Sequence, residues 1–396
     1  MENMNPDSPG MWPRTTYPRE LSRSALPSLF WKSAVSIALQ SALLSGYSLS
    51  QPRPDEPRDT APQAQISILP VPILYYTPDT GVAGGAALMG LHRTAVHDTS
   101  ARPSSIVLDL IYTQKRQIIA EVYPDIFLDG GAYRIMGSIH FSRYPLRFYG
   151  IGNNTPEALE EPYTCRTFRL TLDALRRIAG DFSGGISLLY ETRTLSELHS
   201  DGLLEPGTIT GSRGGRTVGA GVIFHWDTRD NLFASAAGHF YVVALRTSKP
   251  FLGSDFDFTY LTLDFREFLG ITERSVLAMQ ALATMTAGDV PFYMLAQLGG
   301  SNMMRGYYEG RYRDKELIAV QLEYRYPIFW KFGGTAFVGA GDVAPDVTRF
   351  SLQTVKPCVG LGLRYIFDPV ERLNVRIDFG FGRNTSGLYV SAKEAF

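Results

Sequence analysis

Apolar and polar residues alternate strictly over 315–326, a pattern that predicts a β-strand with one oily face and one polar face. The same alternation returns over 358–367 and 373–382. Each strand is apolar on one side over about nine or ten residues, the span of a tilted strand that crosses a bilayer. The oily faces consist of Val320, Leu322, Tyr324 and Tyr326 in the first strand, Val359, Leu361, Leu363, Tyr365 and Phe367 in the second, and Leu373, Val375, Ile377, Phe379 and Phe381 in the third.

The residues between these oily positions are mostly glycines and charged or amide side chains. A soluble sandwich also alternates, but its charged face lies outside and its apolar face is covered by a second sheet. The recurrence over successive strands therefore favours a membrane barrel with a polar interior. Among the interior positions are Gln321, Glu323, Arg325, Gly360, Gly362, Arg364, Asn374, Arg376, Asp378, Gly380 and Gly382.

The strand rhythm continues back to Ile66 and gives sixteen alternating segments. An even number lets a bacterial barrel close with both chain ends in the periplasm. The connections after strands 5, 7, 11 and 13 are long and the even-numbered ones are mostly short, so we expect the long loops outside the cell. The fold prediction is all-β: an outer-membrane-type antiparallel β-barrel of about 16 strands. The segments run approximately over 66–76, 81–93, 104–113, 116–127, 132–144, 163–176, 180–193, 216–226, 237–248, 257–269, 273–286, 315–326, 332–343, 356–367, 371–383 and 386–395.

The long stretch after the eleventh strand, to Asp314, has no period of 2 or 3.6 and reads as a loop. Within it, Met304-Arg305-Gly306-Tyr307 resembles the Val-Arg-Gly-Phe/Tyr loop motif of the BamA/TamA family, the bacterial surface antigen barrel. The strand that follows is similar to that family's post-loop strand with its inward glutamate. Residues 337–343 resemble the family's Phe-x-Asp-x-Gly strand, with Phe337 and Gly341 in register and Gly339 in place of the aspartate. The resemblance covers roughly 65–396.

Three further stretches are similar to short, domain-free members of this family. They are the opening hairpin from Ile68, the loop 148–153, and Asp227-Thr228-Arg229-Asp230-Asn231 after the eighth strand. Phe396 ends the chain on an aromatic residue, which the resemblance implies is the signal by which barrel precursors are recognised. Glu394 stands where an apolar residue would be expected in such a signal.

The start of the chain has the layout of a secretory signal. Basic residues precede the apolar run 33–44, and small residues before Gln51 offer a cleavage site. We therefore expect a signal peptide with a disordered leader over 1–50, a short periplasmic tail over 51–64 and the barrel over 65–396. That tail has no room for the periplasmic POTRA domains of the family, so the resemblance is to a short form that lacks them.

The motif match gives Arg305 a specific role to test. A guanidinium at a glycine-flanked loop tip can enter a lumen and be held there by carboxylates, and Gly306 permits the backbone conformation that this needs. Strand parity puts Glu323 and Asp378 in the same lumen, so either can be the partner. We therefore expect the loop, with Arg305, Gly306 and Tyr307, to fold into the lumen. Asp342 ranks third as a partner, because its parity faces lipid near the outer rim.

Other charged and reactive residues are given plainer interpretations. Arg311 and Arg313 read as rim charges. His140 and Ser142 have a His-x-Ser spacing similar to that of the barrel phospholipase of the outer membrane, but they hold the lumen parity, so we expect lumen lining and no catalysis.

The composition excludes some functions and adds no cofactor. Cys165 and Cys358 lie far apart round the ring, which speaks against a disulfide between them, and the 6 histidines are scattered without metal-ligand spacing. A net charge of −1 gives no basic surface for nucleic acid. The 21 tyrosines, 23 phenylalanines and 38 glycines suit aromatic girdles and a tightly packed lumen. No enzyme activity, cofactor or metal site is predicted.

The resemblance implies a role in assembling or exporting protein or lipid at the bacterial outer membrane. Its partners would be the lipid bilayer, the barrel assembly machinery, and a separate periplasmic partner or exported protein. A passive, porin-like pore for small solutes is the alternative function. An outer-membrane lipid hydrolase is a second alternative, for which His140 and Ser142 are the only thread.

Overall fold

The computed structural model describes five stretches of the chain, 65–77, 81–93, 103–369, 372–392 and 394–396. The expected signal segment and polar tail, 1–64, lie outside the described residues. In the part of the chain that the structure describes, no helix is long and apolar enough to cross a membrane.

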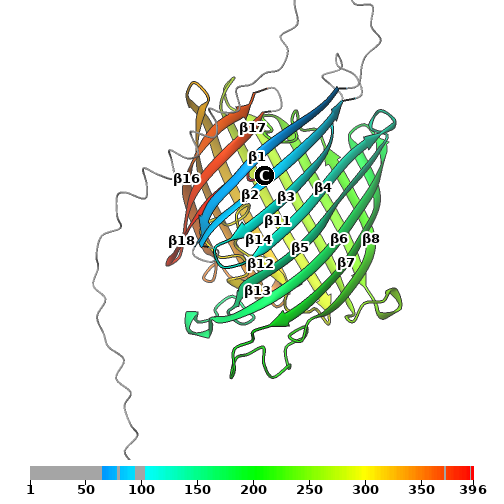
Figure 1. Ribbon diagram of the computed structural model, residues 1–396, viewed down its shortest axis with the longest axis vertical. Coiled ribbons are helices and arrows are strands. Elements are labelled where there is room, and N and C mark those ends of the chain that lie inside the picture. The colour runs from blue at the N-terminus through cyan, green and yellow to red at the C-terminus, as the bar shows by residue number, and fades with distance from the viewer. Residues whose placement is uncertain (1–64, 78–80, 94–102, 370–371, 393) are drawn as a thin grey trace, which may run out of the picture. The chain divides into compact units, whose positions relative to one another are not determined.

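Sixteen of the described strands form one antiparallel sheet, in the order in which they occur along the chain (Figure 1). The two edge strands, β1 and β18, approach each other, so the sheet curls into a barrel. The predicted fold class and strand number are confirmed. The strands of the sheet are Gln65–Thr77 (β1), Gly81–Arg93 (β2), Ser104–Thr113 (β3), Ile118–Leu128 (β4), Tyr133–Phe148 (β5), Glu161–Ala179 (β6), Phe182–Ser196 (β7), Gly215–Asp227 (β8), Gly238–Ser248 (β9), Phe258–Gly270 (β10), Val276–Gly288 (β11), Glu316–Phe329 (β14), Phe332–Ala344 (β15), Lys356–Asp368 (β16), Leu373–Gly382 (β17) and Thr385–Ala392 (β18).

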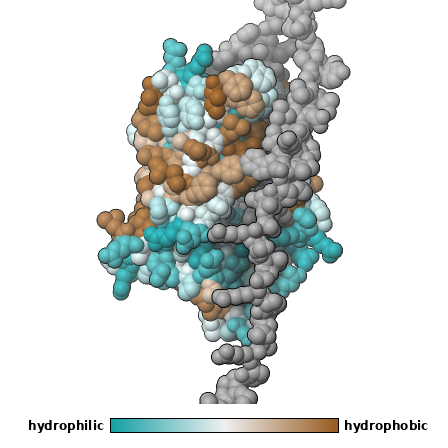
Figure 2. Space-filling model, turned by 90° about the vertical axis from the view of Figure 1, so that its left-hand side faces the viewer, coloured by the Kyte–Doolittle hydropathy of each residue, from teal (hydrophilic) through white to brown (hydrophobic). Residues whose placement is uncertain are grey.

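The predicted oily faces point out of the barrel. On β14, Val320 and Leu322 are 48% and 45% exposed, while Gln321 and Glu323 beside them are buried. Figure 2 shows apolar side chains over the upper wall and hydrophilic ones gathered below. The outward apolar side chains are therefore placed to meet lipid, and the polar residues between them line the interior.

One residue assigned to an oily face is placed wrongly by the sequence pattern. Leu373, the first residue of β17, is buried in a cluster with Met89 and Leu91 of β2. The ladder between β16 and β17 shifts its register between Ile366 and Asp368, which pairs with Leu373. An irregularity of this kind re-aims the neighbouring side chain, so the alternation does not hold at this position.

The two ends of the barrel differ in the length of their connections. Long connections follow β5, β7, β11 and β15 at one end, over 149–160, 197–214, 289–315 and 345–355. At the other end the turn between β14 and β15 is only 330–331. We call these the long-loop end and the short-turn end. Four one-turn 3₁₀ helices lie in the described connections: Asp129–Gly131 (η1), Glu157–Leu159 (η2), Pro250–Leu252 (η3) and Val347–Arg349 (η4).

The loop after β11 contains a short hairpin that the sequence pattern missed. Ala296–Leu298 (β12) pairs antiparallel with Tyr312–Asp314 (β13), and Gly152 of the loop after β5 bridges to Arg313. The prediction of a loop without regular structure is wrong for these residues, because strands of three residues are too short to show a period. The tip of the loop, 303–307, is buried. The loop therefore folds into the lumen, as predicted.

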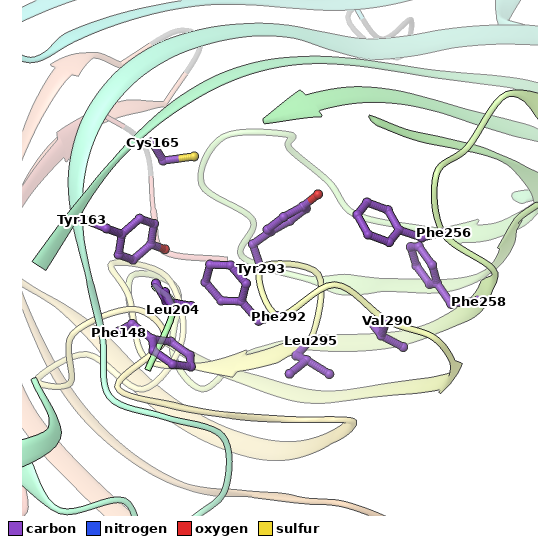
Figure 3. Close-up of a cluster of buried hydrophobic side chains, with 10 residues drawn as sticks. All are labelled: Phe148, Tyr163, Cys165, Leu204, Phe256, Phe258, Val290, Phe292, Tyr293 and Leu295. Carbon is purple, nitrogen blue, oxygen red and sulfur yellow. The ribbon is translucent and has the colours of Figure 1, made fainter. Parts of the chain in front are cut away.

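A buried aromatic cluster ties the long loops together (Figure 3). Phe292, from the loop after β11, packs edge-on against the rings of Phe148 at 5.1 Å and Tyr163 at 5.8 Å between ring centres. Leu204 and Phe256 come from the loops after β7 and β9. We call this set the mouth cluster, and it fixes three loops to the strand ends beneath them.

The last strand ends before its predicted limit of 395. β18 ends at Ala392, and residues 394–396 are not in a strand. Phe396 is buried against Phe268 and Ala278, on the inner faces of β10 and β11. Figure 1 accordingly marks the end of the chain within the outline of the sheet.

Candidate functional site

Arg305 lies at the tip of the loop after β11 and is completely buried inside the barrel. Its Nη2 lies 2.5 Å from Glu323 Oε2 on β14, and its Nη1 lies 2.5 Å from Asp378 Oδ2 on β17. Both carboxylates are also fully buried. The structure thus brings together the three residues that strand parity and the loop motif singled out, and the guanidinium bridges two strands of the wall.

The surroundings keep Arg305 charged although it is buried. Burial alone would lower the pKa of its guanidinium, but the neighbouring charges of Glu323 and Asp378 outweigh this and raise the pKa. The guanidinium carbon also lies 3.6 Å from the centre of the Phe337 ring on β15, a cation–π contact. Phe337, the aromatic residue of the family strand motif, is therefore a third wall contact of the loop tip.

Glycines let the loop tip approach the wall at backbone distance. Gly306 has φ +113°, a conformation that L side chains rarely adopt, and a Cβ there would lie 2.8 Å from backbone atoms of Phe381 and Gly382. A Cβ on Gly380 would lie 2.5 Å from the backbone carbonyl of Arg305. A side chain at Gly306 or Gly380 would therefore push the loop off β17.

Tyr307 fastens the loop on the other side of Arg305. Its hydroxyl donates to the Pro357 carbonyl at 2.9 Å and accepts from the Arg383 backbone N–H at 2.8 Å. The Gly306 N–H donates to the Tyr389 hydroxyl on β18 at 2.8 Å. The motif Arg305-Gly306-Tyr307 thus contacts β14 to β18, the last part of the wall.

Gly339, where the family strand motif has an aspartate, leaves little room for a side chain. A Cβ at Gly339 would meet Cys358 Sγ at 2.9 Å, so an aspartate here would have to displace that thiol. Gly341 is similarly close, with the Ala319 Cβ at 3.0 Å from where its own Cβ would be. The carboxylates around Arg305 come from β14 and β17 instead.

Three more buried arginines surround the two carboxylates, and no motif singled them out. Arg325 Nε lies 2.8 Å from Glu323, Arg364 Nη1 lies 2.5 Å from Asp378, and Arg376 Nη1 lies 3.0 Å from Asp378. All three hold the lumen parity, but parity alone does not tell which interior residues meet. The Arg305 site is therefore part of a larger charge cluster on the inner wall.

Arg313 is not the rim charge that the sequence pattern suggested, whereas Arg311 is half-buried. Arg313 is 3% exposed and donates to the Gly310 carbonyl. Arg311 donates to Thr155, from the loop after β5. Asp342, the third candidate partner of Arg305, is buried and pairs with Lys356 at 2.7 Å. Arg313 and Asp342 are buried beneath the long loops, which strand parity cannot foresee.

His140 and Ser142 face the lumen and form a linked set with a residue not singled out before. His140 Nε2 lies 2.9 Å from Ser142 Oγ, and His140 Nδ1 lies 2.6 Å from Glu121 Oε1. Glu121 is the register partner of His140 on the adjacent strand β4, a pairing that the sequence pattern does not reveal. A nucleophile, a base and a carboxylate thus stand in the order of a catalytic triad.

No group of acidic, histidine and cysteine side chains among the described residues has the geometry of a metal site. Cys165 and Cys358 are both free and buried. Phe396, the expected assembly signal, is buried inside the barrel in the folded chain.

Comparison with known proteins places the chain in a family. No curated protein sequence matches. Among solved structures, BamA from Haemophilus ducreyi lacking POTRA domains 1–3 has 14% identity and a TM-score of 0.55, with 91% of this chain and 78% of that chain covered. CdiB from Acinetobacter baumannii has 14% identity and a TM-score of 0.53, with 82% and 59% covered. CdiB from Escherichia coli has 11% identity and a TM-score of 0.51, with 85% and 68% covered.

At these identities the likeness to BamA and CdiB concerns the fold. The Omp85 superfamily domain model matches residues 163–386, which are more than half of the chain and include the loop motif and all four arginines of the charge cluster. The resemblance to the BamA/TamA type of barrel is thereby confirmed, and the chain belongs to the Omp85 superfamily.

Proposed function

We propose that this protein resides in the bacterial outer membrane and assembles or exports protein or lipid there. The observation that carries the proposal is the loop tip locked into the wall by Arg305, Glu323 and Asp378. A partner could release the ion pairs that hold the loop inside the lumen. A permanently open pore, in contrast, needs no loop that is held in this way. The long-loop end would face outward and the short-turn end the periplasm.

A passive pore for small solutes fits the interior less well. The loop after β11 fills the lumen beside β14 to β17, and the mouth cluster fixes further loops across the long-loop end. Both features reduce the open cross-section. The expected state is therefore closed, with opening tied to movement of the loop.

Conductance in planar bilayers tests this distinction. The wild-type protein should show rare and irregular openings, and Arg305→Ala should open more often because its loop is no longer paired to the wall. Arg349→Ala, which changes an exposed arginine outside the site, should behave like wild type. A steady, wide conductance in the wild-type protein would favour the passive pore.

The cargo and partners are found by crosslinking in cells. A photoreactive residue at the short-turn end, at Trp330, which is 76% exposed, should capture membrane lipid and any periplasmic partner. Loss of the protein should change the content of specific outer-membrane proteins or lipids. The assembly or export role would be contradicted if cells without the protein kept their outer-membrane protein and lipid profiles but lost the uptake of small solutes.

A hydrolase is the second candidate function, favoured by the linked set of Ser142, His140 and Glu121. Ser142 Oγ would attack an ester carbonyl while His140 Nε2 takes its proton and Glu121 orients the ring. The C–O bond to the alcohol would then break, with His140 returning the proton to the leaving alcohol, which leaves an acyl group on Ser142. Water, deprotonated by His140, would attack this acyl group and release the carboxylic acid and the free Ser142 hydroxyl. Because these residues face the lumen and not the bilayer, the substrate would be a water-soluble carboxylic ester and not a membrane lipid. Paired polar residues also line other parts of this wall, such as Ser138 and Thr171 at 2.8 Å, so this candidate ranks below the first.

A fluorophosphonate probe decides the second candidate. An active triad should carry the probe on Ser142, and Ser142→Ala or His140→Ala should abolish labelling and any ester hydrolysis. Ser138→Ala, a hydroxyl lost from the same face of the same strand, is the matched control. Absence of labelling at Ser142 in the folded protein would identify the set as lumen lining.

A further inference from the structure

Residues 394–396, which follow β18, occupy a preformed place on the inner wall. Ala395 and Phe396 are 7% and 8% exposed and pack with Phe268 and Ala278. These two partners face the lumen from β10 and β11, several strands away from β18 round the wall. We call residues 394–396 the tail segment. It crosses from one part of the wall to another instead of continuing the sheet.

Polar contacts also hold the tail segment. Glu394 Oε2 accepts from Arg364 Nε at 2.7 Å, and Glu394 Oε1 accepts from Asn374 Nδ2 at 2.7 Å. Arg325 Nη2 donates to the Phe396 main-chain oxygen at 3.0 Å. The acidic residue that looks out of place in an apolar assembly signal therefore has a buried cationic partner.

The two arginines that hold the tail segment also hold the carboxylates of the Arg305 site. Arg364 bridges Glu394 and Asp378, and Asp378 binds Arg305. Arg325 bridges the Phe396 main chain and Glu323, and Glu323 binds Arg305. Two continuous chains of contacts thus run from the loop tip to the tail segment.

The charge balance of this cluster makes the two ends depend on each other. Among the described residues it contains four arginines (Arg305, Arg325, Arg364 and Arg376) and three carboxylates (Glu323, Asp378 and Glu394). If Glu394 leaves, Arg364 loses one of its carboxylate partners, and its less compensated positive charge weakens the hold on Arg305. If Arg305 leaves, the positive potential that attracts Glu394 falls. By linkage, each stabilises the other to the same degree.

The turn after β8 covers the tail segment from the short-turn end. The Phe233 carbonyl accepts from the Glu394 N–H at 3.4 Å, and the Ser235 carbonyl accepts from Arg325 Nη1 at 3.4 Å. Asn231 fixes the turn by accepting from the backbone N–H groups of Phe233 and Ala234, both at 2.8 Å. This turn therefore contacts both the tail segment and Arg325, one of the arginines that hold it.

We propose that the tail segment is an internal latch, coupled through Arg364 and Arg325 to the Arg305 loop. Docked, it ties the edge strand β18 to the inner wall, and its release and the release of the loop promote each other. The latch goes beyond the proposed function, because it depends on no cargo and on no external partner.

Thiol accessibility measures the latch directly. Ala395→Cys in the full chain, in lipid vesicles, is exposed to a water-soluble maleimide, and peptide mass spectrometry reads labelling at position 395 separately from Cys165 and Cys358. Labelling should be slow in the otherwise unchanged barrel. Adding Arg305→Ala should speed it about fivefold or more, the lower end of typical coupling between sites.

The effect of the tail segment on the loop is tested with one variant in the tail segment and one variant of the β10 residue against which it packs. Glu394→Gln and Phe268→Ala should each speed tryptic cleavage of the loop after Arg311 or Arg313, also about fivefold or more. Phe265→Ala removes the same ring from the lipid face of β10, where it is 40% exposed, and should leave loop cleavage unchanged.

Two results would overturn the latch. One is rapid labelling at position 395 in the folded, otherwise unchanged barrel, because the tail segment would then not be docked. The other is an unchanged labelling rate when Arg305→Ala has demonstrably freed the loop to trypsin. A variant that fails to fold is recognised by loss of its heat-dependent gel mobility; Glu394→Gln, which keeps the shape of the side chain, then carries the test alone.

Discussion

At the scale of single residues, the hold on Arg305 is the first property to measure. Removing one member of a buried charge pair typically costs about 3–5 kcal/mol, whereas an exposed pair contributes about 0–1 kcal/mol. Because Arg305, Glu323 and Asp378 are fully buried, Arg305→Ala and Glu323→Ala should each free the loop to trypsin. The protease-sensitive fraction of folded protein is the measurement.

A double-mutant cycle separates the two carboxylates. The variant that combines Arg305→Ala with Glu323→Ala should be little worse than either change alone, because both remove the same pair. The cycle with Asp378→Ala should show the same deficit from additivity. Strictly additive losses of protection would show that the carboxylate in question does not interact with Arg305.

Gly306 gives a second test at this scale. Gly306→Ala places a methyl group 2.8 Å from the β17 backbone at φ +113°, so the loop tip should leave the wall and become sensitive to trypsin. Gly84→Ala is the control, because a Cβ there meets nothing within 4 Å. Equal protection of the loop in both variants would contradict the close backbone contact.

Part of this site can be predicted from the sequence. Alternation puts Glu323 and Asp378 inside the barrel, and the motif puts Arg305 at a loop tip, so these three could be named in advance. Arg364 could not be selected from the other interior charges, because alternation tells which face a residue occupies and not which neighbour it meets. The burial of Arg313 could not be predicted either, because a loop sequence does not show which other loop will cover it.

At the scale of the strands, alternation makes a sharp prediction on β5. Ile139 points to lipid and is 42% exposed, while its neighbour Ser138 faces the lumen. Arginine on a lipid face near mid-bilayer costs roughly 2–4 kcal/mol, and lumen positions tolerate it far better. Ile139→Arg should therefore lower the yield of folded barrel in refolding assays. Ser138→Arg should fold nearly as well as wild type.

Strands could be predicted because each repeats its pattern over many residues. The elements that escaped prediction are short or irregular. β12 and β13 have three residues each, and Leu373 lies at a register shift. The tail segment was expected to extend the last strand but leaves the sheet, because contacts with Phe268 on β10 and Arg364 on β16 decide its course.

At the scale of the whole molecule, export and membrane integration should occur together. The apolar outer faces of sixteen strands can be covered only by lipid or detergent. We expect cleavage between about Ser45 and Gln51, recovery in the outer-membrane fraction, and a gel mobility that changes on boiling. Soluble cytoplasmic protein with residues 1–50 intact would contradict both expectations.

The contacts of Arg305 also show at which stage of barrel assembly its loop can dock. Its two carboxylates stand 18 and 73 residues after the arginine, and Tyr389 of the last strand receives the Gly306 N–H. While the chain is still threading its final strands into place, the guanidinium has no complete set of partners and the loop has no surface to rest on. Docking of the loop should therefore follow the assembly of the last strands. An assembly intermediate that lacks these strands should have an undocked loop.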